Sequence, residues 1–360
     1  MQNAFQTEYT SAESIFVTAA TAAGAVIERT SHPLRGPRGE RLGTLCAWIG
    51  PRDAARVFVT ISGAHGAEGF AGSGMQVSWL RRMREPGLPQ DSAVLFIHGI
   101  NPFGFAWLRR TTEEGVDLNR NFVDFSQSLP DNPGYRELAD AFVTHSIDEA
   151  SLIAAEARFA DYRARHGEAA YLAARGAGQY SNPEGLFYGG GAPTWARRTS
   201  EAIIDAYTLT GRKVAVVDLH TGLGPYGYGE LIAGADPMTE QAQRLVDWYG
   251  PTLTQPALGG SVIVPQLGMA HLGWRARIGD GLTFAYLEFG TRVPFFMQRA
   301  LCRDHWLHAQ GTPDWDDPLT RGIKADMLHA YMPARPDWHE MVAFRASQVF
   351  DQALAGLAAQ

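Results

Sequence analysis

The sequence predicts an α/β fold in which a mixed, mainly parallel sheet lies between helices in a single domain. Five short apolar runs, at residues 42–49, 56–62, 93–98, 214–219 and 283–287, are typical of buried strands. Segments with helical spacing of apolar residues lie between several of them, and this alternation indicates a parallel sheet covered on both faces. A chain of 360 residues, of which 45% are hydrophobic and 19% charged, can bury such a core.

The helices are expected where apolar residues recur at intervals of three and four. These segments are residues 8–28, 72–82, 134–176 and 339–358, the last of them amphipathic. Because one of these segments is long and lies between two predicted strands, we expect a helical insertion at about residues 125–212. The rest of residues 1–360 is expected to form the same single domain.

Charge and cysteine content exclude several classes of function. The formal net charge of −7 argues against nucleic acid or an anionic membrane as the main partner. Cys46 and Cys302 lie far apart and form no Cys-x-x-Cys motif, so we expect neither a disulfide framework nor a thiolate metal site. The first residues lack a basic segment followed by an apolar block, and no run of 18 apolar residues occurs. We therefore expect a cytoplasmic protein, with its oligomeric state left open.

The segment Gly-Ala-His-Gly-Ala-Glu-Gly at residues 63–69 directly follows a predicted strand. Its glycines permit a sharp turn, after which His65 and Glu68 can point into one space and bind one zinc ion. The spacing alone is weak, because 11 His and 38 acidic residues in 360 produce roughly one such pair by chance. A second pair, His145 with Asp148, lies in a polar, helix-like stretch and is expected to have no function.

Polar residues also stand at the ends of other predicted strands. His65, His98, His220 and Glu288 each follow or end an apolar run, and the carboxyl ends of parallel strands form the ligand crevice of such sheets. His220 is a candidate third zinc ligand, and Asp218 could orient an imidazole. The alternative for His220 is a hydrogen bond to a loop carbonyl.

Glu288 is an acid in apolar surroundings, where loss of solvation raises the pKa of a carboxyl into the range of a general base. A buried salt bridge with Arg275 or Arg292 is an equally good interpretation.

The loop 101–122 carries side chains that bind carboxylates and oxyanions, namely Arg109, Arg110, Asn119, Arg120 and Asn121. Its arginines could instead pair with Glu113, Glu114 and Asp117.

Taken in order, these motifs resemble the M14 zinc carboxypeptidase superfamily. The matching strings are His65-x-x-Glu68, Gly115-Val-Asp-Leu-Asn-Arg-Asn-Phe122, Asp218-Leu-His220 and Glu288-Phe-Gly-Thr291. With His98-Gly-Ile-Asn-Pro-Phe-Gly-Phe105 they are most similar to the DUF2817 group of M14-like metallopeptidases. The resemblance covers residues 56 to about 295, and the combination of motifs is far more specific than any one of them.

The resemblance implies a zinc carboxypeptidase-like fold and a role for each matching residue. His65, Glu68 and His220 would bind Zn²⁺, and Glu288 would be the general base and proton shuttle. Arg110 would polarise the carbonyl oxygen, with its neighbour Arg109 as the other candidate. Asn119 and Arg120, together with Arg109, would bind a carboxylate of the substrate.

Two departures from the digestive carboxypeptidases widen the range of functions. Residues 250–285 contain no tyrosine, although a mobile tyrosine is usual there, and Thr112 stands where asparagine is common. Tyr226, Tyr228 and Tyr286 are candidates for the missing group. We therefore expect a zinc hydrolase that cleaves an amide beside a carboxylate, as a metallocarboxypeptidase acting on small peptides. The alternatives are an N-acyl amino-acid amidohydrolase, as in succinylglutamate desuccinylase and aspartoacylase relatives, and an inactive binding module.

Overall fold

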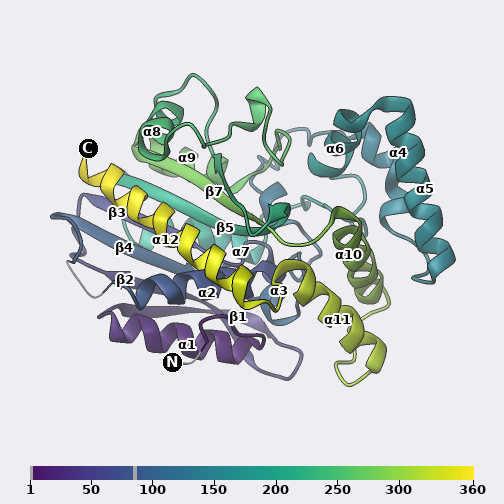
Figure 1. Cartoon of the computed structure of the whole chain (residues 1–360), viewed down its shortest axis with the longest axis horizontal. Coiled ribbons are helices and arrows are strands. Elements are labelled where there is room, and N and C mark those ends of the chain that lie inside the picture. Colours follow the sequence, from purple (N-terminus) through teal and green to yellow (C-terminus); the bar gives the residue numbers. More distant parts are fainter. Residues whose placement is uncertain (1–2, 84–86) are drawn as a thin grey trace.

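A seven-stranded mixed sheet forms the centre of the computed structural model, which describes residues 3–83 and 87–360 (Figure 1). Its strand order is β1-β2-β4-β3-β5-β7-β6. The strands are β1 (Val26–Arg35), β2 (Arg41–Ile49), β3 (Arg56–Ile61), β4 (Ser92–His98), β5 (Lys213–Tyr226), β6 (Gly229–Ala233) and β7 (Leu282–Gly290). The four central strands β4, β3, β5 and β7 run parallel, and the others pair antiparallel at the two edges. This confirms the predicted fold class.

Helices cover both faces of the sheet because successive strand residues point to opposite sides. Phe58 of β3 belongs to one apolar core, whereas Val57 and Val59 belong to the other. The first core is covered by α1 (Tyr9–Ala22), α2 (Gly69–Leu80), α8 (Glu240–Tyr249) and α12 (Pro336–Ala358). The second is covered by α7 (Trp195–Ala206) and α9 (Ala270–Ile278). Figure 1 shows α12 crossing the sheet on the same side as α1 and α2.

A third apolar core lies beside the sheet and includes Tyr135, Phe159, Tyr171 and Leu301. It is formed by α4 (Pro133–Phe142), α5 (Glu149–His166), α6 (Glu168–Gly176), α10 (Pro294–Ala309) and α11 (Pro318–Tyr331), at the right of Figure 1. Helices α4 to α6 lie within the insertion expected at about 125–212, whereas α7 from the same stretch packs on the sheet. The division into one domain with an insertion stays a prediction.

The remaining elements are short. They are α3 (Pro102–Ala106) and the 3₁₀ helices η1 (Gly66–Glu68), η2 (Leu118–Arg120), η3 (Pro256–Leu258) and η4 (Gly279–Gly281). The helix expected at residues 8–28 ends at Ala22, because Gly24 turns the chain with a φ of +79°. The prediction was therefore wrong for residues 26–28, which begin strand β1. In the described part of the chain, no helix combines the length and apolar character needed to cross a membrane.

Candidate metal centre

The turn after β3 presents His65 and Glu68 from a backbone packed tightly against a second loop. The backbone N–H groups of Gly66 and Ala67 donate to the carbonyls of Arg110 and Arg109, at 3.1 and 3.0 Å. A Cβ on Gly66 would lie 2.0 Å from the carbonyl carbon of Gly104, so only glycine fits. The turn therefore holds both candidate ligands, which are buried, in a fixed relation to the 109–110 segment.

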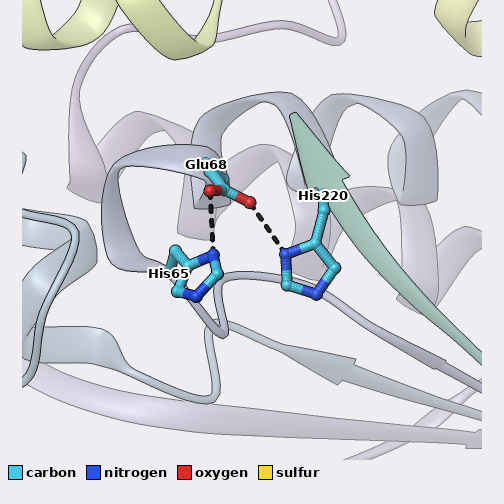
Figure 2. A group of neighbouring side chains, drawn as sticks. All are labelled: His65, Glu68 and His220. Atoms are coloured by element: carbon cyan, nitrogen blue, oxygen red, sulfur yellow. Dashed lines mark hydrogen bonds and ion pairs between the residues drawn. The ribbon is translucent and has the colours of Figure 1, made fainter. Parts of the chain in front are cut away.

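His65, Glu68 and His220 converge on one point (Figure 2). Glu68 Oε1 lies 2.9 Å from Nδ1 of His65, and Glu68 Oε2 lies 2.9 Å from Nδ1 of His220. The three potential donor atoms all lie within 4.8 Å of one another, and among the described residues no other His, Cys, Asp and Glu side chains form such a group. Two imidazole nitrogens and one carboxylate are the ligand set of a catalytic zinc, which keeps a further position open. The residues thus fit the metal that the sequence predicts.

A carboxylate stands behind each imidazole. Asp117 Oδ1 lies 3.1 Å from Nε2 of His65, and Asp218 Oδ2 lies 3.0 Å from Nε2 of His220. The second contact is an ion pair at a poor angle, since the oxygens of Asp218 make no hydrogen bond. Such carboxylates fix the ring orientation and make the metal-facing nitrogen more basic. Asp218 has the position that the sequence suggested, whereas Asp117 was considered only as a partner of arginine.

The surroundings of Glu68 and His220 favour their charged forms. Burial favours the neutral form of Glu68, but the two histidines outweigh burial and lower the pKa of its carboxyl. Burial opposes the charge on His220 as well, yet Asp218 and Glu68 raise its pKa well above the usual value. A metal ion that binds the neutral imidazole would therefore displace a proton from His220.

Glu288 stands next to the ligand group on the neighbouring strand. It pairs with His220 in the parallel register of β5 and β7, and one carboxylate oxygen accepts a hydrogen bond from Leu223 N at 3.0 Å. Burial, helped by the negative charge of Glu68, raises the pKa of Glu288 to about 8. Within the described part of the chain, Glu288 forms no salt bridge with Arg275 or Arg292, which leaves its carboxyl available for proton transfer.

The two adjacent arginines have different surroundings. Arg110 forms an ion pair with Asp117 at 3.1 Å, approaches Glu68 at 3.4 Å and lines the site cavity. Arg109 is not among the described residues that line this cavity. Its side chain is buried near Asp304 of α10, whose charge partly offsets the effect of burial in lowering the pKa of Arg109. The structure therefore places Arg110, and not Arg109, where a substrate could be bound.

Asn119 and Arg120 reach the site from η2. Asn119 Oδ1 accepts from Ala270 N at 3.2 Å, and its amide nitrogen lies 3.4 Å from Nε2 of His220. The guanidinium of Arg120 is buried and donates to the carbonyls of Asn119 and Gly176 at 2.7 and 2.6 Å. Its Nε has no hydrogen-bond partner, so one donor of a buried cation stays unused.

The candidate residues other than Arg109 line a common cavity of about 120 Å³. Apart from the polar residues above, its wall includes Leu172, Arg175, Phe187, Ile232, Val262, Ile263, Val264, Met269, Tyr286, Met297, Leu301 and Tyr331. Tyr286 thus lies at the site, where its hydroxyl contacts Nδ1 of His271 at 2.9 Å, whereas Tyr226 and Tyr228 are exposed. Arg175 and Tyr331 had no sequence signal, because they belong to helices far from every motif.

Two other histidines of the sequence analysis lie outside the site. His98 at the end of β4 is stacked on Phe16 and contacts Ser73 Oγ at 2.9 Å through Nε2. His145 is exposed, and Asp148 caps the N-terminus of α5 by accepting from Ser151 N. Position at the end of a strand therefore does not by itself distinguish the candidate metal ligands from the other histidines.

Residues 5–345 match the family model described as "Protein of unknown function (DUF2817)". No curated protein is detectably similar to the chain. Among solved structures, carboxypeptidase A from Helicoverpa armigera is 13% identical, with 95% of this chain and 73% of that one covered and a TM-score of 0.43. The succinylglutamate desuccinylase from Chromobacterium violaceum is 14% identical, with 89% and 74% covered and a TM-score of 0.37.

A metallo-carboxypeptidase from Burkholderia cenocepacia is 13% identical over 88% of this chain and 67% of that one, with a TM-score of 0.39. All three similarities are distant. The family match is different in kind, because it extends over nearly the whole chain and includes every candidate residue of the metal centre. The protein is a member of the DUF2817 family, as its motifs suggested.

Proposed function

We propose that the protein is a zinc-dependent hydrolase that cleaves an amide bond beside a carboxylate-bearing group. The observation that carries the proposal is the meeting of His65, Glu68 and His220 at a cavity that Glu288 also lines. A metal site with three protein ligands and a neighbouring carboxyl of raised pKa has the parts of a hydrolytic centre. The resemblance to the M14 superfamily supports the same reaction.

Each polar residue has a separate task in this proposal. His65, Glu68 and His220 would hold the zinc ion, which would supply a Lewis acid for the carbonyl group and lower the pKa of a bound water. Glu288 accepts the proton of the attacking water on its carboxylate and gives it to the leaving amine. Arg110 stabilises the negative charge that develops on the carbonyl oxygen, because Asp117 holds its guanidinium beside Glu68.

The substrate carboxylate is assigned to Asn119 and Arg120. Arg120 is a buried cation whose hydrogen bonds go only to neutral acceptors, and its Nε has no partner. The charge of Asp117 offsets only part of the cost of burying this guanidinium, and a bound carboxylate removes more of that cost. The resemblance assigns the same role to the same pair.

Two kinds of substrate satisfy these requirements. A metallocarboxypeptidase releases the last residue of a peptide, and an N-acyl amino-acid amidohydrolase releases a small acid. The cavity of about 120 Å³ is small beside the roughly 300–1,000 Å³ of pockets for drug-sized ligands. This volume favours the amidohydrolase, or a carboxypeptidase of very short peptides.

Metal analysis combined with hydrolysis assays tests the proposal. The wild-type protein should bind about one zinc per chain, and His65→Ala should abolish binding. Glu288→Gln should keep the zinc but lose about 10²- to 10⁴-fold in kcat, whereas the control Glu240→Gln, exposed on α8, should keep full activity.

A panel of di- and tripeptides and N-acyl amino acids then identifies the substrate class. Release of a free C-terminal residue from peptides indicates a carboxypeptidase, and release of a small acid indicates an amidohydrolase. If the protein binds zinc but hydrolyses neither class of substrate, the remaining interpretation is an inactive binding module. If Glu288→Gln does not change the rate of hydrolysis, Glu288 is not the general base.

A further inference from the structure

Arg175 is a cation of the site cavity to which neither the motifs nor the proposed reaction assigns a task. It lies in the last turn of α6, inside the helical insertion, and its side chain is partly buried. Within residues 3–83 and 87–360 it forms no hydrogen bond and no ion pair. The cavity wall around it is largely apolar, with Leu172, Phe187 and Leu301 among its residues. An anion that enters the cavity can form a charge-assisted hydrogen bond with this guanidinium.

The other two arginines of the cavity already have tasks in the proposed reaction. Arg110 is neutralised by Asp117 and Glu68. Arg120 donates to Gly176 O, which ties η2 to the end of α6 and fixes the helix that carries Arg175. The acids of the wall, Glu68 and Glu288, belong to the metal group and its base. Arg175 therefore contributes positive charge that no protein acid of the cavity is placed to balance.

Arg175 and Arg120 reach the cavity from different elements. Arg175 belongs to α6, and Arg120 belongs to η2 beside Asn119. Two cations that line one cavity can hold two separate anionic groups of one small molecule.

We propose that Arg175 binds a second anionic group of the substrate, so that the preferred substrate is a dianion. One carboxylate lies at Asn119 and Arg120 beside the scissile amide, and the second is bound by Arg175. This assignment rests on the proposed function for the bond that is cleaved, whereas the binding preference can be measured without turnover. The chemical class is an N-acyl amino acid, or a short peptide, with an additional carboxylate.

Calorimetric binding to zinc-loaded Glu288→Gln protein tests the preference. The probes are N-butyryl-norleucine with one carboxylate, and N-succinyl-norleucine and N-butyryl-glutamate with two. At least one dianion should bind about 10- to 100-fold more tightly than the monoanion, as expected for one charge-assisted contact. Adding Arg175→Gln should remove this difference, and Arg175→Lys should keep part of it. Arg136→Gln, exposed on α4, is the matched control and should retain the whole difference.

Several results would overturn the inference. These are dianions that bind no more tightly than N-butyryl-norleucine, no detectable binding of either dianion, and an Arg175→Gln variant that weakens all three probes equally. In the active protein, Arg175→Gln should raise KM for the dianion and leave kcat nearly unchanged. Hydrolysis without a preference for dianions contradicts only the role of Arg175. Arg175-dependent binding without hydrolysis of any amide contradicts only the proposed function.

Discussion

Asp117 lies behind the imidazole of His65, a candidate zinc ligand. It contacts Nε2 of His65 and binds Arg110 through its other oxygen, while the Asn119 backbone donates to it at 3.0 Å. In Asp117→Asn the negative charge behind the imidazole is lost, so the zinc dissociation constant should rise about 10- to 100-fold. Competition with a chelator measures this constant, and the exposed Asp124→Asn is the control. An unchanged affinity in Asp117→Asn would show that Glu68 alone orients the ring.

His98 should make stability depend on pH. Burial lowers the pKa of this imidazole to about 3, compared with about 6.5 in an unfolded chain. Between these values the unfolded state binds more protons than the folded state, so stability that is complete above pH 6.5 is lost as the pH falls toward 3. At pH 5 the loss from His98 amounts to about 2 kcal/mol, from 1.5 pH units at about 1.36 kcal/mol each.

Urea unfolding of the metal-free protein at pH 7 and pH 5 measures this effect. His98→Gln keeps a hydrogen-bonding group for Ser73 but cannot gain a proton, so its free energy of unfolding should fall about 2 kcal/mol less than that of the wild type. The exposed His145→Gln should behave as the wild type. If His98→Gln and wild type lose the same stability, the imidazole does not titrate as proposed.

At the scale of elements, the turn at residues 63–69 is built around the backbone of α3. Gly66→Ala would place a methyl group against Gly104, where backbone atoms cannot move aside cheaply. The free energy of unfolding should fall by about 3 kcal/mol, and zinc binding should weaken because His65 moves with the turn.

Chemical denaturation of Gly66→Ala tests this requirement. Gly322→Ala on α11 is the matched control, since nothing lies within 4 Å of its Cβ position and alanine favours helix by up to about 1 kcal/mol. Equal stability of Gly66→Ala and wild type would mean that the two loops are not packed as described.

The central strands could be predicted because both of their faces are buried and their sequences are continuously apolar. Strands β3, β4, β5 and β7 are of this kind. The edge strand β1 is mostly exposed, so it lacked an apolar pattern and its start was assigned to the preceding helix. Strand β6 has only five residues and depends on pairing with β7. Edge strands depend on their neighbours more than on local sequence.

At the scale of the whole molecule, the metal group joins segments that are distant in sequence. Glu68 and His220 are 152 residues apart, so the three ligands meet only in the folded chain. Zinc at 100 times its dissociation constant should therefore add about 2.7 kcal/mol to the free energy of unfolding. Thermal unfolding with and without zinc measures the shift. His65→Ala should remove it, and a zinc effect that survives in this variant would indicate binding elsewhere.

The order of the motifs along the chain identified the family and proposed the metal ligands and the base, because these residues follow or lie in strands that apolar runs reveal. The tertiary structure separated Arg110 from Arg109, placed Asp117 behind His65, and brought Arg175 and Tyr331 into the cavity wall. The physical reason for this difference is the distance along the sequence between the residues that interact. Strand burial and sharp turns depend on adjacent residues, whereas the direction of a side chain and the wall of a cavity depend on packing between elements far apart in sequence.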